Sequence, residues 1–100
     1  MIDMRRPVLS SLRSIVTARA LAAVRLAHAT PEEFIDRHLR GDWGDSDVDA
    51  AADNEIALVE GGRVLSTFLL ATGVRIWVLT EAIQANGSRA ATTLLLPDEY

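Results

Sequence analysis

The sequence predicts a single two-layer α+β domain, in which N-terminal helices pack on a C-terminal three-stranded antiparallel sheet. One hundred residues, 49% hydrophobic and 24% charged, suit one globular domain. Up to Glu60 the apolar residues recur at helical intervals, and from Arg63 they alternate with a period of two. Because each helix must bury its apolar stripe, we expect these helices to cover one face of the sheet.

The N-terminal part is expected to combine a loose arm, one short strand and one helix. Residues 1–14 have weak periodicity and contain Pro7, which is typical of an arm outside the domain formed by residues 15–100. Residues 14–17 are short and β-branched, so they are a candidate for an extra edge strand. A helix is predicted over residues 19–28. Its apolar stripe consists of Ala20, Leu21, Val24, Ala27 and His28.

A second helix is predicted to start after Thr30 and to end near Gly41. Thr30 is spaced to cap it, Pro31 suits its first position, and Glu33 is placed to return a bond to the cap. Its buried stripe is expected to consist of Phe34, Ile35 and His38.

A third helix is predicted over residues 47–60. Acidic residues gather near its N-terminus, where the helix dipole favours them. Ser46 and Asp49 repeat the capping-box spacing, and Gly61-Gly62 ends the helix. The residues expected to face inward are Val48, Ala52, Ile56 and Val59.

Three strands follow, and their succession predicts an antiparallel meander. Alternating apolar residues indicate strands over residues 63–70, 74–81 and 90–96. The connection before the last strand contains Asn86-Gly87, a strong turn signal. Trp77 lies in the central strand and is therefore expected in the core.

Charge is distributed unevenly along the chain. The net charge is −4, but residues 1–28 sum to +4, and residues 42–60 contain seven acidic residues and no basic one. This acidic segment repels phosphate, so we expect no direct binding to nucleic acid and a partner protein with a basic surface. A solvated helix face is the alternative meaning of such a run. The candidate protein-binding residues are Asp42, Trp43, Asp45, Asp47, Asp49 and Asp53.

The loop over residues 41–45 has two interpretations. In the functional one, Trp43 is an interface anchor within an acidic patch. In the structural one, Trp43 packs on the core while Asp42 or Asp45 binds local backbone amides and caps the next helix. The glycines that bound this turn favour the structural interpretation.

Three sequence blocks, in a fixed order, carry a resemblance to a known family. They are GDWGD at residues 41–45, GRVLS at 62–66, and the tail IWVLTEA at 76–82 followed by RAATTLLLPDEY at 89–100. They resemble the GDWGD, LSxY and WxITEADRxxTTxLLPxEY stretches of a family of small, plasmid-related proteins of bacterial mobile elements. The resemblance implies a setting on mobile DNA, where proteins that counter host defences are common.

The chain departs from the family pattern at three places. Phe68 stands where a tyrosine is usual, and Ser88 stands where an aspartate precedes the arginine of the family. Residues 83–87 look like an insertion. The chain therefore lacks the aspartate–arginine pair of the family.

The first functional hypothesis is a non-catalytic protein that binds a host protein, as an anti-CRISPR or anti-restriction inhibitor would. It would act in the cytoplasm through its acidic surface, with no membrane contact. The chain has no cysteine, two histidines and no glycine-rich phosphate loop, so we expect no metal and no cofactor.

Two alternatives belong to other classes. A barnase-like endoribonuclease would use His38, Glu81 and Arg89 as base, carboxylate and phosphate clamp. A buried histidine and a cross-strand ion pair are the structural interpretation of the same residues. A regulatory module that self-associates as a homodimer through an exposed edge strand is the third hypothesis.

Overall fold

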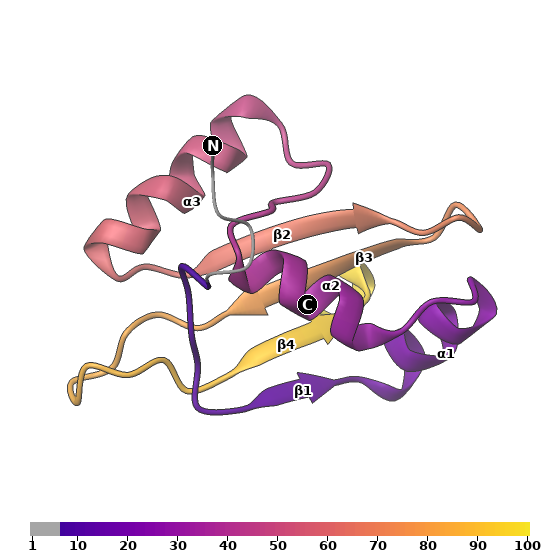
Figure 1. Ribbon diagram of the computed structural model, residues 1–100, viewed down its shortest axis with the longest axis horizontal. Helices are drawn as coiled ribbons and strands as arrows, with labels where there is room; N and C mark the ends of the chain where they lie inside the picture. The colour runs from indigo at the N-terminus through magenta and orange to yellow at the C-terminus, as the bar shows by residue number, and fades with distance from the viewer. Residues whose placement is uncertain (1–6) are drawn as a thin grey trace.

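The computed structural model describes residues 7–100, and it confirms the α+β class. Three helices and a four-stranded sheet are followed by one short 3₁₀ helix, as Figure 1 shows. The elements are β1 (Ser14–Val16), α1 (Ala18–Leu26), α2 (Pro31–Leu39), α3 (Val48–Glu60), β2 (Val64–Leu69), β3 (Arg75–Thr80), β4 (Thr92–Leu95) and η1 (Pro97–Glu99).

The sheet is mixed, with the strand order β1-β4-β3-β2. Strands β2, β3 and β4 form the predicted antiparallel meander, with Ser66 opposite Val78 and Val78 opposite Leu94. The candidate edge strand over residues 14–17 is confirmed as β1. It joins the edge of β4 in a parallel register, Ser14 opposite Thr92, so the sheet is not purely antiparallel. A parallel partner needs a long crossover, and here the crossover contains all three α-helices.

Residues 7–13, which belong to the expected arm, lie against the domain. Val8 N–H donates to Leu39 O at 2.8 Å, and Leu12 N–H donates to Arg89 O at 2.9 Å. The side chain of Leu9 is buried against Trp43 and α3 residues. Ser14, the last residue of the expected arm, begins β1, and residues 1–6 lie outside the described residues.

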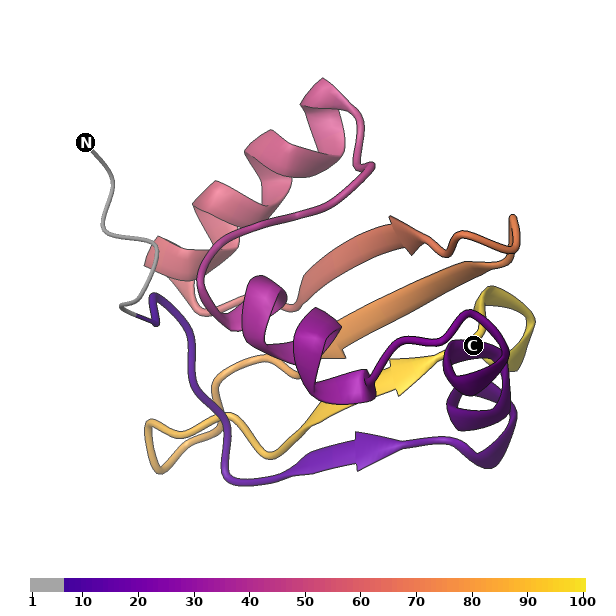
Figure 2. The same ribbon diagram turned by 45° about the vertical axis from the view of Figure 1, so that its right-hand side comes forward.

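Helices α1 and α2 cover one face of the sheet, as Figure 2 shows. The predicted stripe of α2 is confirmed, because Phe34, Ile35 and His38 are all buried. The ring of Phe34 lies 5.4 Å from that of Phe68 on β2. Leu70, just after β2, and the facing residues of the sheet complete this main core: Phe68, Ile76, Val78 and Leu94.

The helix starts differ in detail from the predicted capping boxes. Thr30 precedes α2 but makes no side-chain cap hydrogen bond, so Pro31 and the acidic first turn mark that start. Asp47, not Ser46, caps α3, because its Oδ1 accepts the Ala50 N–H at 2.8 Å. The Ser46 hydroxyl instead donates to Trp43 O at 2.8 Å.

The inward face of α3 differs from the predicted one. Asn54 and Ala57 are its buried residues, whereas Val48 is 85% exposed and Val59 is 88% exposed. Helix α3 lies beside the β2 edge of the sheet, so a small residue and an amide fit there better than branched apolar side chains (Figure 1). The predicted C-terminus is confirmed, since Gly61 adopts φ +87° at the C-cap.

Asn54 closes part of the exposed edge of β2. Its Nδ2 donates to Leu65 O at 2.7 Å, and its Oδ1 accepts the Leu65 N–H at 3.1 Å. Two residues along, Thr67 N–H donates to Trp43 O at 3.2 Å, and Thr67 O accepts the Asp45 N–H at 2.6 Å. The side-chain amide and the loop thus act as a substitute strand, which makes this edge a poor template for pairing with a second copy.

We expect the Asn54→Ala variant to lose about 2–3 kcal/mol of unfolding free energy, because both backbone groups of Leu65 then lack their partner. Urea denaturation at neutral pH measures this loss. The Asp53→Ala variant, changed at the neighbouring exposed position, should remain within about 0.5 kcal/mol of the wild type. Equal stability of the two variants would contradict the assigned role of Asn54.

Candidate functional site

The candidate acidic residues divide into two sets. Asp42 has a local role, because its Oδ1 accepts the Gly44 N–H at 2.9 Å and its Oδ2 accepts Arg37 Nε–H at 2.7 Å. The others are exposed at the start of α3 or just before it, at Asp45, Asp47, Asp49 and Asp53. No ion pair between described residues involves any of these four.

Trp43 has a structural position. Its side chain is buried, and its ring meets the His38 imidazole edge-on at a centroid distance of 5.9 Å. The loop glycine Gly44 has φ +69°, and a Cβ there would lie 2.0 Å from Thr67 O. The geometry therefore favours the interpretation in which Trp43 packs on the core and Asp42 holds the turn.

A stripe of apolar side chains on α3 points to solvent. Val48, Ala52, Ile56 and Val59 recur every three or four residues and therefore share one face of the helix. Val48 and Val59 are almost fully exposed, and Ile56 is 53% exposed. Asp49, Asp53 and Glu60 lie along one flank of this stripe, and Glu55 lies along the other, as their helical spacing requires. We call the four apolar residues of the stripe, together with the four acidic residues that flank them, the α3 ridge.

A groove of about 650 Å³ lies on the sheet face turned away from α1 and α2. Leu65, Trp77 and Leu79 line it from β2 and β3, and they alternate with the core residues of those strands. Asp45, Asp47 and Asp53 border it from the side of α3. The fold thus brings three of the predicted acidic residues around one apolar surface.

The C-terminal residue forms one wall of the groove. The Tyr100 ring lies 5.8 Å from that of Trp77, and the Arg63 guanidinium lies 5.5 Å from the Tyr100 ring centroid while donating to its hydroxyl. Two contacts fix η1 and hence Tyr100: Thr17 Oγ1 donates to Glu99 Oε1 at 2.7 Å, and Arg19 pairs with Asp98 at 3.1 Å.

Sequence reasoning missed the aromatic side of the groove. Trp77 was expected in the core, but it is only half-buried and lies on the opposite sheet face from Ile76 and Val78. The alternation of the strand contained this signal, because Trp77 falls out of phase with the residues that pack beneath the helices.

His38 is enclosed in a chain of buried hydroxyl groups. Its Nδ1 hydrogen-bonds Ser66 Oγ at 2.6 Å, its Nε2 hydrogen-bonds Thr80 Oγ1 at 2.8 Å, and Thr80 Oγ1 lies 2.7 Å from Thr92 Oγ1. The side chain is fully buried. Burial, and secondarily the charge of Arg89, lower the pKa of His38 from 6.5 to about 4. An imidazole with both nitrogens engaged and no exposure offers no base to a substrate.

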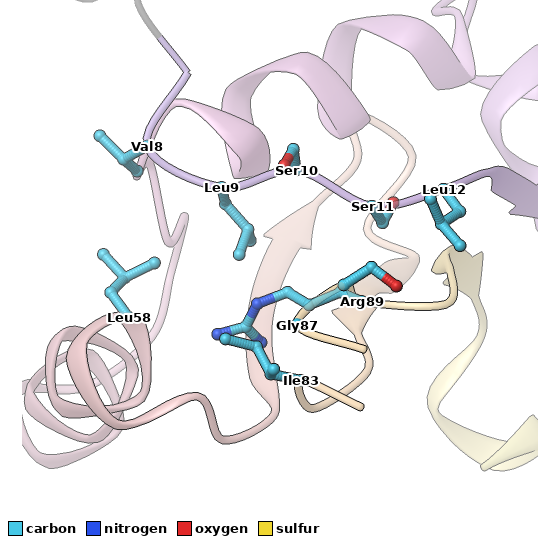
Figure 3. Close-up of a pocket in the computed structure, with 10 residues that line it drawn as sticks. Val8, Leu9, Ser10, Ser11, Leu12, Leu58, Ile83, Gly87 and Arg89 are labelled. Carbon is cyan, nitrogen blue, oxygen red and sulfur yellow. The ribbon is translucent and has the colours of Figure 1, made fainter. Parts of the chain in front are cut away.

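Arg89 is also occupied. Its guanidinium donates to three backbone carbonyls, at 2.6 Å to Gly62 O, 3.0 Å to Glu81 O and 3.1 Å to Ala57 O. Burial lowers its pKa from the usual value. Figure 3 shows the guanidinium beside Ile83, in a pocket of about 380 Å³ beneath the segment that runs from Val8 to Leu12.

Glu81 does not complete a catalytic set. Its Oε2 is buried without a hydrogen-bond partner among the described residues. Neither Glu81 nor His38 lines the pocket beside Arg89. The three residues of the ribonuclease hypothesis are thus near one another in the fold, but they do not present their functional groups to a common cleft.

Comparison with protein families, curated proteins and solved structures returns no match. Within residues 7–100, no three histidine or acidic side chains are grouped as metal ligands would be. None of the described helices combines the length and the apolar character that a bilayer crossing needs. The assignment of function therefore depends on the surface and on the interior contacts described above.

Proposed function

We propose that the chain is a non-catalytic binding protein that docks on a basic surface of another protein through the α3 ridge. One observation carries this proposal: α3 turns its apolar stripe toward solvent and flanks it with acidic residues. The helix is held in place from behind, by Asn54 on the edge of β2 and by Arg89 at Ala57 O. Burial of its outer face is therefore not needed for folding.

The spacing of the stripe fits a known mode of recognition. Val48, Ala52, Ile56 and Val59 span about three turns, or about 16 Å along the axis. An amphipathic helix that enters a groove on its partner uses anchors at such intervals. Contiguous exposed apolar surface on a small domain commonly marks a site of contact with another protein.

The flanking charges define the partner. Asp49, Asp53, Glu55 and Glu60 remain without ion pairs among the described residues, so their field extends into solvent. A basic rim on the partner would accelerate association and fix the orientation of docking. Surfaces that bind nucleic acid are basic, and the resemblance to mobile-element proteins makes a CRISPR or restriction complex of the host our proposed target.

The geometry gives less support to the two alternatives. A ribonuclease needs an accessible acid–base group, whereas both nitrogens of His38 are engaged in the interior. A symmetric dimer through the α3 ridge would place two acidic flanks against each other. Edge pairing through β2 is also opposed, because Asn54 and the Asp45 amide already bind the backbone of that strand.

The proposal is tested by binding to purified defence complexes of the host, from which nucleic acid has been removed. We expect the Asp49→Asn/Asp53→Asn variant to associate about tenfold more slowly than the wild type at low salt and to lose most of the salt dependence. The Val48→Ser/Val59→Ser variant should instead dissociate faster. Surface plasmon resonance separates the two rates.

The matched control is the Glu32→Gln/Glu33→Gln variant, which removes the same charge from the exposed first turn of α2. It should bind like the wild type. Absence of binding to every complex, or equal binding by all four proteins, would refute the proposed role of α3.

A further inference from the structure

We propose that the groove between α3 and the outer face of β2 and β3 holds an extended, arginine-bearing segment of the partner protein. This inference rests on the proposed function and adds a second contact beside the α3 ridge. The groove was not among the surfaces that the charge pattern predicts, because Leu65, Thr67, Trp77, Leu79 and Tyr100 line it from the strands and from the end of the sequence.

The floor of the groove is an uncovered apolar sheet face. Helices α1 and α2 cover the opposite side, so Leu65 and Trp77 remain partly accessible. Tyr100 borders them at one end, and residues of α3 border them along one side. An aliphatic or aromatic side chain of a partner would remove this surface from water. The volume of about 650 Å³ accommodates a few side chains of a peptide rather than a folded domain.

The rim is net acidic, because Asp45, Asp47 and Asp53 outnumber Arg63 among the charged residues that line the groove. Asp45 and Asp53 are exposed, border the groove and lack ion pairs among the described residues. Asp47 also borders the groove, and its Oδ1 caps α3. A phosphate or an acidic segment would be repelled here, whereas a basic segment is complementary to the rim.

The aromatic wall favours arginine as the basic residue. The Arg63 guanidinium of the chain itself already lies over the Tyr100 ring, so Trp77 is the aromatic residue of the groove that remains for a cation of the partner. Guanidinium groups stack on aromatic rings and bind carboxylates with two parallel hydrogen bonds, whereas an ammonium group does neither in this form. An arginine from the partner would meet Trp77 with its stem and the Asp45 or Asp53 carboxylate with its fork.

The groove and the α3 ridge share one boundary. Asp53 lines the groove and also flanks the exposed stripe of α3. A partner that packs against Val48 and Val59 would therefore bring a neighbouring segment close to the groove. The two contacts require different chemistry, apolar on the ridge and cationic in the groove, so they can be separated by experiment.

The test uses the intact chain and a synthetic peptide, acetyl-Gly-Leu-Arg-Leu-Arg-Gly-amide, followed by NMR. The indole N–H of Trp77 should shift and saturate at millimolar peptide, while that of the buried Trp43 provides an internal reference. The same peptide with citrulline in place of arginine keeps the shape and removes the charge. It should bind at least about tenfold more weakly.

Variants locate the contact. We expect Asp45→Asn/Asp53→Asn to weaken peptide binding about tenfold, and Glu32→Gln/Glu33→Gln to leave it unchanged. No saturable shift of Trp77, or equal binding of the arginine and citrulline peptides, would overturn the inference. The Val48→Ser/Val59→Ser variant separates the two proposals, since it should dissociate faster from the complex but bind the peptide like the wild type. If the wild type binds the peptide but docks on no defence complex, only the proposed function is refuted. If it docks on a complex but the peptide does not shift the Trp77 indole, only the groove proposal is refuted.

Discussion

The Arg89→Met variant is expected to lose about 3–5 kcal/mol of unfolding free energy, a large part of what a domain of this size has. Methionine keeps most of the side-chain length but removes every donor. The carbonyls of Ala57, Gly62 and Glu81 would then lose the guanidinium that joins them. Urea denaturation of Arg89→Met and of the wild type, analysed with one common m value, measures the loss.

The control for this change is Arg75→Met, which makes the same replacement at an exposed position of β3. It should alter stability by no more than about 0.5 kcal/mol. Because Ala57 O belongs to the last turn of α3, we also expect the C-terminal end of α3 to exchange its amide hydrogens faster in Arg89→Met. If Arg89→Met were as stable as Arg75→Met, Arg89 would not be the residue that joins α3 to the sheet.

The elements with local signals were predictable from the sequence. Pro31 and the apolar spacing of α2 depend only on neighbours in the chain, and so does the alternation of β2, β3 and β4. The parallel pairing of β1 has no such signal. Its three residues bind β4 at the far end of the chain, and no local pattern specifies a partner at that distance.

Helix α3 shows where periodicity stops being informative. The helix carries two apolar arcs, one with Val48 and Val59 and the other with Ala57 and Leu58, and the spacing suits both. The branched residues are the more hydrophobic, so the sequence favours their burial. The tertiary contact of Asn54 with the backbone of Leu65 decides the orientation instead, and it leaves the more apolar arc exposed.

The candidate site was predictable only in its acidic part. A run of acidic residues without a base can be counted in the sequence, and it placed Asp45, Asp47 and Asp53 on a surface. The groove also needs Trp77 from β3 and Tyr100 from the chain end, which meet only after the sheet forms and η1 packs beside it. Residues that come together from separate elements leave no common pattern in the sequence.

Acidification is expected to destabilise the protein through His38, by about 3 kcal/mol between neutral pH and pH 4. In the unfolded chain this imidazole takes up a proton near pH 6.5, whereas burial lowers its pKa in the folded chain to about 4. Between these values the unfolded state binds more protons, so stability falls as the pH falls. Above pH 6.5 both states are neutral, and the full stability is present.

The His38→Gln variant isolates this contribution. Glutamine retains a donor and an acceptor near Ser66 and Thr80, so the variant should fold with reduced stability at neutral pH. Its unfolding free energy should depend less steeply on pH, so the difference from the wild type should shrink as the pH falls toward 4. His28→Asn, changed at an exposed position with φ +57°, is the matched control for the removal of a histidine.

The buried imidazole of His38 and the guanidinium of Arg89 are electrostatically linked, which gives this prediction a second test. The charge of Arg89 contributes to the low pKa of His38, so its removal in Arg89→Met should raise that pKa toward the ordinary value. The stability of Arg89→Met should then decrease over a narrower pH range than that of the wild type. An NMR titration of the His38 ring follows both proteins. A ring that titrates near pH 6.5 in the folded wild type would contradict its enclosure between Ser66 and Thr80.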